Sequence, residues 1–367
     1  MNFARDVVDA ADPRRPALVA VARDGARSEV AFGEVADRSA RLAGTLAARG
    51  VGRGDAVMTL IGNRPEWVYA MVACWRLGAA AQPCTEQLRP GDLRARIDRV
   101  EPRAIVVDAR DVDLIGATGF DGPVLVVPDE RLFESEPVPA AELGPEDPAL
   151  IVFTSGTAGE PNPIRHGARY LEGQHVQAEH WYGARPGDLC WCTAASGWSL
   201  SARNAFVAAW LRGAAALLHD GRFDPGERID LLEREGVSVL CMSPTEYRAI
   251  AKRGDLRPLP ALRHAVAVDE EGRDSGRVDD QLPGIDPGPK ARQRPPHRAG
   301  LHRRPDRHSG QMAGLGLPVA VVHGHADRLL PGQDHLGVER LAGGDRVAQG
   351  RERAQVAALR DRPVLGG

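Results

Sequence analysis

Hydroxyl-bearing residues and glycines are concentrated in one short segment, directly after the apolar run Ile151–Phe153. The segment reads Thr154-Ser-Gly-Thr-Ala-Gly-Glu-Pro161. Glycine has no Cβ atom, so main-chain N–H groups beside it can approach an anion closely, and the hydroxyls add further donors. The segment therefore predicts a phosphate-binding loop, although many Ser/Thr/Gly segments are only turns. The candidate phosphate-binding residues are Thr154, Ser155, Gly156, Thr157 and Gly159.

Two better-known motifs do not fit this segment. A Walker A loop continues with Gly-Lys-Ser/Thr, and no such triplet follows Gly159. A serine hydrolase built on Ser155 would need the order Gly-x-Ser-x-Gly, whereas the order here is Thr-Ser-Gly-Thr. Neither a Walker-type nucleotide site nor a serine nucleophile is therefore predicted.

The five cysteines give no sign of a disulfide framework or a metal site. Their number is odd and their spacing is irregular. Cys190 and Cys192 alternate within an apolar run and are interpreted as strand residues, because a metal ion would need further ligands. No metal site is predicted, and no catalytic residue is assigned.

The chain around the loop alternates short apolar runs with helical patterns, which is typical of an α/β protein with parallel or mixed sheets covered by helices. Helical patterns cover Pro65–Leu77, Ser201–Leu211 and Pro225–Glu235. Strand-like runs occur at Ala56–Ile61, Ala104–Val107, Val124–Val127, Leu150–Phe153, Leu189–Thr193, Ala214–Leu218, Val237–Met242 and Ala265–Val268. We expect one α/β unit over residues 1–150 and a second, which carries the loop, over residues 151–269.

The 367 residues have a formal net charge of -3, with 43% hydrophobic and 26% charged residues. This balance is that of a folded protein and gives no reason to expect nucleic acid as a partner. No apolar run reaches about 18 residues, so no membrane span is expected. Met1–Arg14 lacks the apolar centre of a signal peptide, so we expect a cytoplasmic protein. The oligomeric state is not predicted.

The composition changes near residue 270. All Phe, Trp and Tyr residues lie between Phe3 and Tyr247, and the later part of the chain is rich in Gly, Pro, Arg and His. Lys290–His308 is strongly basic, but it has no aromatic side chain on which a base could stack, so it is interpreted as solvated chain. We expect residues 270–367 to form an irregular, low-complexity tail.

The order of residues in the loop resembles the phosphate-binding signature of the adenylate-forming (AMP-binding) superfamily, which includes the acyl-CoA synthetases. Further segments resemble this family, and in part its medium-chain acyl-CoA synthetase branch, in the same order along the chain. They are Asn63–Glu66, Leu77–Pro83, Cys84–Pro90, Gly197–Trp198, Ser201–Phe206 with Trp210, and Ser243–Arg248. The likeness implies the large N-terminal domain of the adenylate-forming fold, with stacked mixed sheets flanked by helices, here incomplete.

The resemblance also implies an ATP-dependent acid–thiol ligase. A small carboxylic acid would attack the α-phosphate of ATP, supplied with Mg2+, and coenzyme A (CoA) would then take the acyl group from the acyl-adenylate. The loop would hold the β- and γ-phosphates, because such chemistry needs charge neutralisation and alignment. Gly197 and Trp198 would border the acyl pocket, although ordinary core packing is an equal reading of Trp198. For Trp210 core packing is the favoured reading.

The chain departs from the family pattern at the end of the loop. The family continues with Pro-Lys, whereas Pro161 is followed by the neutral Asn162, which loses a charge-assisted contact with phosphate. Arg165 is close enough in sequence to act as an auxiliary phosphate contact. The chain has only two lysines, Lys252 and Lys290, and neither stands in the context of the lysine in the family's C-terminal domain.

A larger departure follows Leu262–Val268. The aromatic-Gly-x-Thr-Glu segment of the family is missing, and no ribose-binding Asp can be placed securely. We hypothesise a frameshift near Asp269, because GC-rich codons read out of register give mainly Arg, Gly, Pro, Ala and His; a naturally divergent tail is the alternative. The chain as written is expected to be a truncated and catalytically impaired acyl-CoA synthetase. The alternatives are a non-catalytic nucleotide- or acyl-binding remnant and an unstable truncated product.

Overall fold

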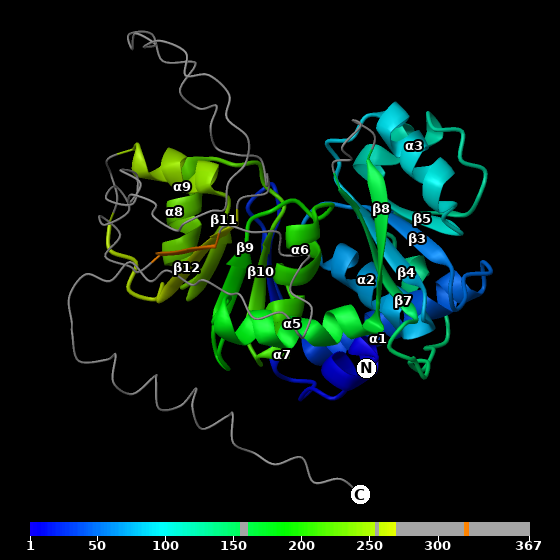
Figure 1. The fold of residues 1–367 in the computed structure, drawn as a ribbon, viewed down its shortest axis with the longest axis horizontal. Helices are drawn as coiled ribbons and strands as arrows, with labels where there is room; N and C mark the ends of the chain where they lie inside the picture. Colours follow the sequence, from blue (N-terminus) through cyan, green and yellow to red (C-terminus); the bar gives the residue numbers. More distant parts are fainter. Residues whose placement is uncertain (155–160, 254–256, 269–318, 323–367) are drawn as a thin grey trace, which may run out of the picture.

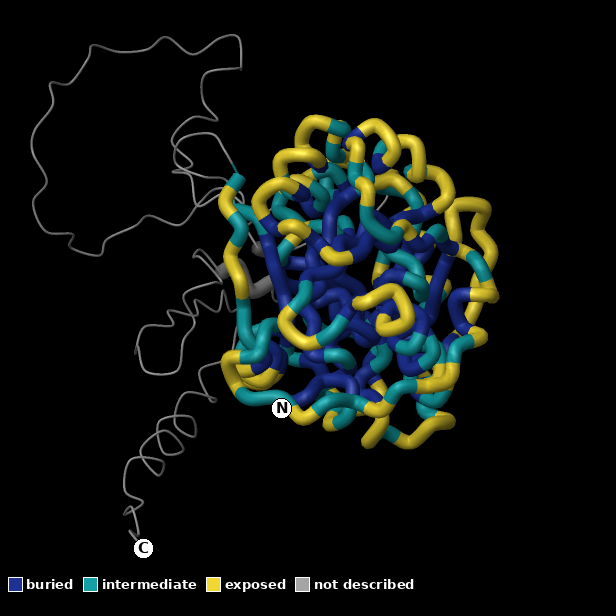
Figure 2. Tube along the Cα trace, turned by 90° about the vertical axis from the view of Figure 1, so that its right-hand side faces the viewer, coloured by how far each residue is buried: buried dark blue, intermediate teal, exposed yellow. Residues whose placement is uncertain are grey.

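The computed structural model describes residues 1–154, 161–253, 257–268 and 319–322. Within these ranges the strands form two mixed β-sheets, one of seven strands and one of six, with helices around them (Figure 1). This confirms the predicted α/β architecture of stacked mixed sheets flanked by helices. A large apolar core contains strand residues of both sheets, and Figure 2 shows the buried segments at the centre of the fold.

The larger sheet has the strand order β13-β12-β11-β9-β10-β1-β2, and only β2 runs antiparallel to its neighbour. Its strands are β1 (Pro16–Val21), β2 (Arg27–Ala31), β9 (Leu189–Cys192), β10 (Ala215–His219), β11 (Val239–Met242), β12 (His264–Val268) and β13 (Val319–Val322). Because the strands other than β2 are parallel, their carboxyl ends lie at one edge of the sheet, where α/β proteins commonly bind ligands.

The smaller sheet has the order β6-β5-β3-β4-β7-β8, and β8 is its one antiparallel strand among the described residues. Its strands are β3 (Ala56–Leu60), β4 (Ala80–Cys84), β5 (Ala104–Asp108), β6 (Val124–Val127), β7 (Pro148–Thr154) and β8 (Asn162–Gly167). The strand that leads into the predicted loop, β7, is parallel to β4, so the loop starts at the carboxyl edge of this sheet.

Local sequence explains where several helices begin and end. Pro65 opens α2, and Gly78 ends it with a φ of 74°, a conformation that costs glycine little. The side chain of Asp224 caps the start of α8, and Ser243 and Glu246 form a capping box at the start of α9. The helices are α1 (Phe32–Ala47), α2 (Pro65–Leu77), α3 (Pro90–Val100), α4 (Val112–Gly116), α5 (Ala168–His180), α6 (Ser199–Asn204), α7 (Val207–Leu211), α8 (Pro225–Arg234) and α9 (Pro244–Ala251).

Each of the eight strand-like runs corresponds to a strand, with shifts of at most two residues at either end. The predicted helices over Pro65–Leu77 and Pro225–Glu235 are also confirmed, as α2 and α8. The predicted helix Ser201–Leu211 is interrupted, because it forms α6 and α7 with a break at Phe206, whose φ of -143° is not helical. The Phe206 ring packs against Trp75 at 5.8 Å and against Trp210 at 4.9 Å between ring centroids, so tertiary packing prevails over helix continuity here.

Trp210 is a core residue, in agreement with its favoured reading. Its side chain is buried, its Nε1 donates to Ala17 O at 2.9 Å, and its ring packs against Phe32 at 5.0 Å. An indole with its one donor satisfied and its faces covered has no surface left for a ligand.

The division of the chain into separate folding units, residues 1–150 and 151–269, stays a prediction. Each of the two sheets, however, contains strands from both sides of this boundary. The early strands β1 and β2 join the later strands of the larger sheet, whereas β7 and β8 join the earlier strands of the smaller one. Much of the expected tail, and with it the hypothesised frameshift near Asp269, lies outside the described residues. Within the expected tail the structure describes residues 319–322, where β13 pairs in parallel with β12. The division that makes 270–367 a separate low-complexity tail stays a prediction.

Candidate functional site

The predicted phosphate loop is the connection of a β-hairpin. Thr154, the last residue of β7, pairs with Asn162, the first residue of β8, and Phe153 pairs with Pro163. Thr154 is partly exposed at this edge of the sheet. Ser155, Gly156, Thr157 and Gly159 lie outside the described residues, so the structure fixes the two ends of the loop.

Arg165 lies on the same hairpin but away from the loop. It pairs with Ile151, three positions along the strand from Asn162, which corresponds to about 10 Å of extended chain. Its side chain is exposed. The structure therefore does not bring Arg165 directly against the loop ends, and its role as an auxiliary phosphate contact stays a prediction.

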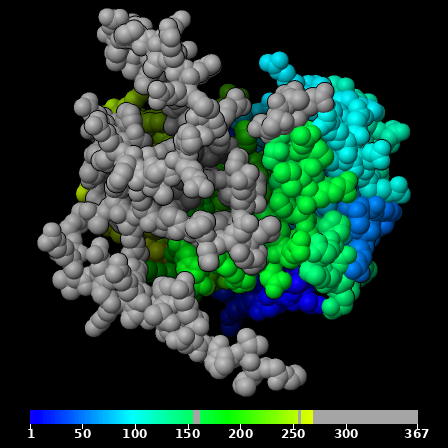
Figure 3. Space-filling model, viewed as in Figure 1, coloured from blue at the N-terminus to red at the C-terminus, as the bar shows by residue number. Residues whose placement is uncertain are grey.

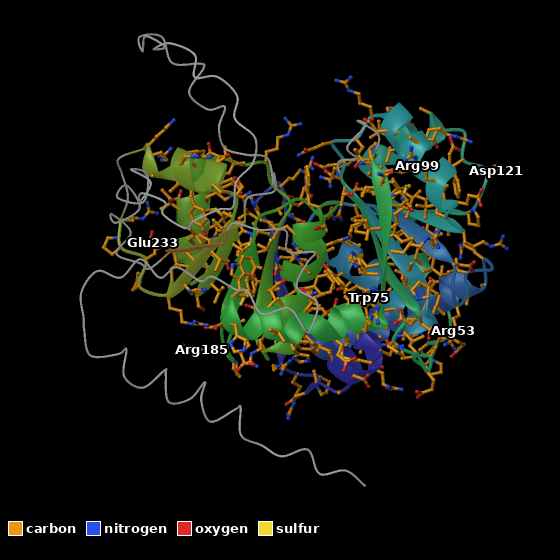
Figure 4. The ribbon with its side chains drawn as sticks, viewed as in Figure 1. Arg53, Trp75, Arg99, Asp121, Arg185 and Glu233 are labelled. Atoms are coloured by element: carbon orange, nitrogen blue, oxygen red, sulfur yellow. The ribbon has the colours of Figure 1, made fainter. Side chains whose placement is uncertain are left out.

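Two other arginines, both on α3, do reach the hairpin. The Nη1 of Arg99 donates to Pro161 O at 2.6 Å and to Asn162 Oδ1 at 3.1 Å. The guanidinium of Arg96 lies over the ring of Phe153, 4.8 Å from its centroid. Figure 4 shows Arg99 beside β8, and the surfaces of α3 (cyan) and of the β8 region (green) adjoin in Figure 3. Neither residue was predicted from the sequence, because their three-residue spacing on one helix is the one local signal that links them.

The second pair of predicted site residues packs onto the end of β4. A Cβ atom added to Gly197 would lie 2.0 Å from Thr85 N and 2.3 Å from Cys84 C, so the main chain of 197 lies directly on that of 84–85. β4 and β7 are in register through Ala81 and Leu150. Continued along the strands, this register places Thr85 level with Thr154, so Gly197 approaches the strand beside the start of the loop.

Trp198 follows at the N-terminal end of α6. Its side chain is 45% exposed, unlike Trp210, which is 2% exposed. An indole with nearly half its surface free is not an ordinary core residue, so core packing is the less suitable reading of Trp198. Its exposed surface is available to an apolar ligand, and its place in an acyl pocket stays a prediction.

Further contacts join the carboxyl edges of the two sheets. Asn63 Nδ2 donates to Ala194 O at 3.1 Å, and the hydroxyl of Ser196 donates to Ile61 O. Arg110 Nη1 lies 2.9 Å from the carboxylate of Asp220. These contacts bring the segments after β3 and β5 against those after β9 and β10. The family-like segments 63–66 and 197–198, distant in sequence, therefore lie at the same interface between the sheets.

A buried polar network occupies the carboxyl edge of the larger sheet. His219 Nδ1 lies 3.0 Å from Arg228 Nη1, and Glu246 Oε2 accepts from Thr193 Oγ1 at 2.8 Å. Arg228 and Glu246 are themselves 3.8 Å apart. Since a guanidinium can only donate, His219 Nδ1 must accept, and the ring proton resides on Nε2, which faces Glu227 at 3.3 Å. Burial, and then the charge of Arg228, lower the pKa of His219 below its usual range.

The family-like segment Ser243–Arg248 supports this edge. The Tyr247 hydroxyl lies 3.2 Å from Leu240 O and 3.0 Å from Val266 O, so it bridges β11 and β12. Burial raises the pKa of Tyr247 well above its usual range. The tyrosine is therefore a structural group that connects two parallel strands at the described end of the family-like region.

Metal and membrane features are not found in the described part of the chain. Its His, Cys, Asp and Glu residues include no group of three or more that could hold a metal ion. None of its helices combines the length and the hydropathy needed to cross a bilayer. The cysteines are all buried in the apolar interior, and burial raises the pKa of Cys74 and of Cys84 to about 12, so these two thiols are poor nucleophiles.

Solved structures with a similar fold include CoA ligases. An acyl-CoA synthetase from Brucella canis superposes with a TM-score of 0.72 over 88% of this chain and 56% of its own, at 22% identity. The anthranilate CoA ligase AuaEII, solved in complex with anthranoyl-AMP, gives 0.65 over 72% and 54%, at 21% identity. At this identity the likeness defines the class of fold, the large domain of the CoA ligases.

The sequence assigns the chain within that class. It belongs to the AMP-binding enzyme family, whose sequence model matches residues 6–276. It is 29% identical over 297 residues to the mitochondrial acyl-coenzyme A synthetase ACSM4 of Mus musculus, covering 73% of this chain and 51% of the relative. It is 28% identical over 297 residues to the mitochondrial acyl-coenzyme A synthetase ACSM3 of Homo sapiens, covering 73% and 50%. The chain thus spans about half the length of the curated relatives it matches.

Proposed function

We propose that this chain is the N-terminal part of an ATP-dependent acyl-CoA synthetase of the medium-chain type, in fatty acid metabolism. Such an enzyme activates a small carboxylic acid as its adenylate, releases pyrophosphate, and transfers the acyl group to CoA. The observation that carries the proposal is the place of the Thr154–Gly159 loop sequence, at the carboxyl end of β7 and level with the contact between Gly197 and Thr85. Membership of the AMP-binding family supports it.

In this proposal the loop binds the triphosphate. Thr154 is the last residue of β7 and is partly exposed. After it, the hydroxyls of Ser155 and Thr157 would donate hydrogen bonds to the β- and γ-phosphates. The main-chain N–H groups near Gly156 and Gly159 would donate to the same phosphates. These donors are neutral, so they orient the phosphates without cancelling their charge. No group of His, Cys, Asp and Glu in the described ranges suits a metal, so we assign Mg2+ no protein ligand.

The acyl group is proposed to lie beside Trp198. The contact between Gly197 and Thr85 holds this segment against β4, and the exposed indole offers an apolar wall near the start of the loop. Binding of hexanoate that weakens in Trp198→Ala would support this role. The chain length of the natural substrate is not part of the proposal.

We propose further that the chain as written is catalytically impaired. The sequence after β12 lacks the aromatic-Gly-x-Thr-Glu pattern, Lys252 lies at the C-terminal end of α9, and Lys290 lies outside the described residues. For the same reason a non-catalytic nucleotide- or acyl-binding remnant is the second candidate. A cytoplasmic location stays a prediction; the names of the mouse and human relatives describe those proteins as mitochondrial.

Calorimetry of the full chain with Mg2+–ATP and with hexanoate, beside an assay of pyrophosphate release, tests these proposals. Binding of both ligands with pyrophosphate release that depends on the acid would support a working ligase. Binding without release would support the remnant. A chain that is folded but binds neither ligand would contradict both.

A further inference from the structure

The carboxylate of Asp220 lies where the carboxyl edges of the two sheets meet. Asp220 follows β10 of the larger sheet, and its side chain is 7% exposed. Its Oδ2 lies 2.9 Å from Arg110 Nη1 and 3.4 Å from Arg23 Nε. Its Oδ1 faces the main chain of Gly62, where an added Cβ atom would lie 2.1 Å away. Arg23 follows β1, Gly62 follows β3 and Arg110 follows β5, so one buried carboxylate contacts segments of both sheets.

Gly62 connects this carboxylate with the segment 194–198, which ends at the exposed tryptophan. The carbonyl before Gly62 accepts from the Ser196 hydroxyl, and the side chain after it, that of Asn63, donates to Ala194 O at 3.1 Å. A change at the carboxylate that moves Gly62 therefore moves this segment as well.

Arg23 provides a second connection to the same segment. Its Nη2 lies 2.5 and 2.7 Å from the two carboxylate oxygens of Glu86, and its Nε donates to Asp220 O at 2.9 Å. Glu86 comes directly after Thr85, against which the main chain of Gly197 packs. Both connections therefore run from Asp220 to the same short stretch of chain.

Arg110 holds the carboxylate from the smaller sheet. Its Nε and Nη2 donate to the buried Asp108 carboxylate at 2.9 and 2.8 Å, and Nη1 is the nitrogen that faces Asp220. Arg64 Nη1 donates to Asp108 as well, at 2.7 Å. Hydrogen bonds between charged groups are strong, and salt screens buried pairs only weakly. Paired charges in fixed positions therefore set the spacing between the two sheet edges.

We infer that Asp220, held by Arg23 and Arg110, is a positioning residue for the carboxylic acid substrate. By fixing the spacing between the sheet edges, it holds Trp198 in the place that the acid requires. The inference rests on the proposed function, because it takes the acid to bind beside Trp198. The contacts of the Asp220 carboxylate are with segments after β1, β3 and β5, whereas the proposed phosphate loop follows β7. The residue is therefore assigned to binding of the acid rather than of ATP.

Calorimetry of the full chain with hexanoate and, separately, with Mg2+–ATP tests this role. Asp220→Asn keeps the shape of the side chain but removes its charge. It is expected to weaken hexanoate binding about tenfold and Mg2+–ATP binding by less than about threefold, because a misplaced segment affects the ligand that it contacts. Gly62→Ala places a methyl group against the same carboxylate and is expected to act similarly. The double variant is expected to be little weaker than either single one, because both changes disturb one contact.

Asp188→Asn is the matched control. The Asp188 side chain is 11% exposed and paired with Arg263, but it precedes β9 and so lies at the opposite, amino edge of the larger sheet. Loss of its charge is expected to lower the free energy of unfolding, as in Asp220→Asn, which chemical denaturation measures. Its hexanoate affinity is expected to stay within about twofold of the unaltered chain, because the site is distant.

The inference would be overturned by full hexanoate affinity in Asp220→Asn, by an equal loss in Asp188→Asn, or by an equal loss of Mg2+–ATP affinity in Asp220→Asn. If Asp220→Asn does not fold, Arg23→Gln, at a partly exposed side chain, takes its place. It is expected to weaken hexanoate binding about threefold, and full affinity in it would overturn the inference equally.

Failure of the inference can be told from failure of the proposed function. Hexanoate binding that Asp220→Asn and Arg23→Gln retain, but that Trp198→Ala loses, would contradict the inference alone. If the unaltered chain does not bind hexanoate, the proposed acid site fails and the inference fails with it.

Discussion

Gly197 and Thr85 are in main-chain contact, although more than a hundred residues separate them in sequence. A Cβ atom at 197 would lie 2.0 Å from Thr85 N, and a main-chain atom cannot move aside as a flexible side chain can. We expect Gly197→Ala to lower the free energy of unfolding by about 1–3 kcal/mol, the usual cost of overpacking. Chemical denaturation measures this change.

Gly173→Ala is a suitable control for that substitution. Gly173 lies inside α5, and a Cβ atom there would meet nothing within 4 Å. Alanine in an open helical position is expected to stabilise the chain by about 0.4–1 kcal/mol. Equal changes in the two variants would contradict the close contact of Gly197 with Thr85.

The two tryptophans of the family-like segment 198–210 are expected to differ sharply. Trp210→Ala should cost about 3–5 kcal/mol of unfolding free energy, because it opens a cavity among Phe3, Phe32 and Phe206. Trp198→Ala should change stability by less than about 1 kcal/mol, because the side chain is 45% exposed. Chemical denaturation measures both changes in the free energy of unfolding. A large loss of stability in Trp198→Ala would show that Trp198 is a core residue.

The stability of the chain should depend on pH through His219. Its pKa is lowered in the folded state, so the unfolded chain takes up a proton that the folded chain resists. The contribution of the neutral imidazole to the free energy of unfolding is complete at pH values above the pKa of His219 in the unfolded chain, about 6.5. It decreases as the pH falls below that value. Arg228, Glu227, Asp220 and the Trp191 ring surround the imidazole.

Glutamine at 219 can still accept from Arg228 but does not titrate. We expect His219→Gln to be less dependent on pH than the unaltered chain between pH 7.5 and pH 5.5, measured by chemical denaturation at each pH. His180→Gln, on the exposed end of α5, is the control and should retain the dependence. Parallel curves for His219→Gln and the unaltered chain would contradict the buried neutral imidazole.

The hypothesis of a frameshift near Asp269 is tested on the nucleotide sequence. Translation of the gene downstream of that codon in the other two frames is expected to give an aromatic-Gly-x-Thr-Glu segment and the return of aromatic residues. If neither frame contains that segment, the tail is a natural divergence, and impaired activity would need another explanation.

Much of the fold could be predicted from sequence, because buried parallel strands and helices leave distinct apolar patterns. Pro65–Leu77 and Val124–Val127 were predicted with the residues they have in the structure. The strands β1, β2, β4, β8 and β13 were not predicted. β8 has mostly exposed or partly exposed residues and lacks an apolar run, and β1 joins strands that follow it by almost two hundred residues. Pairing over such distances is decided by packing rather than by local pattern.

The site was predicted less completely than the fold. The order of hydroxyls and glycines identifies the loop, and the glycine at 197 marks a close approach that the structure places at Thr85. The contacts of Arg99 with Pro161 and Asn162 could not be predicted, because they depend on how α3 packs against the hairpin. Sequence proximity favoured Arg165 instead, whereas the strand pairing places Arg165 three positions away from the loop end.

A crystal structure of the full chain with Mg2+–ATP tests the central claim most directly. Phosphate oxygens are expected within about 3 Å of the hydroxyls and N–H groups of Thr154–Gly159. Triphosphate bound elsewhere, with the N–H groups of this loop bonded within the protein, would contradict it.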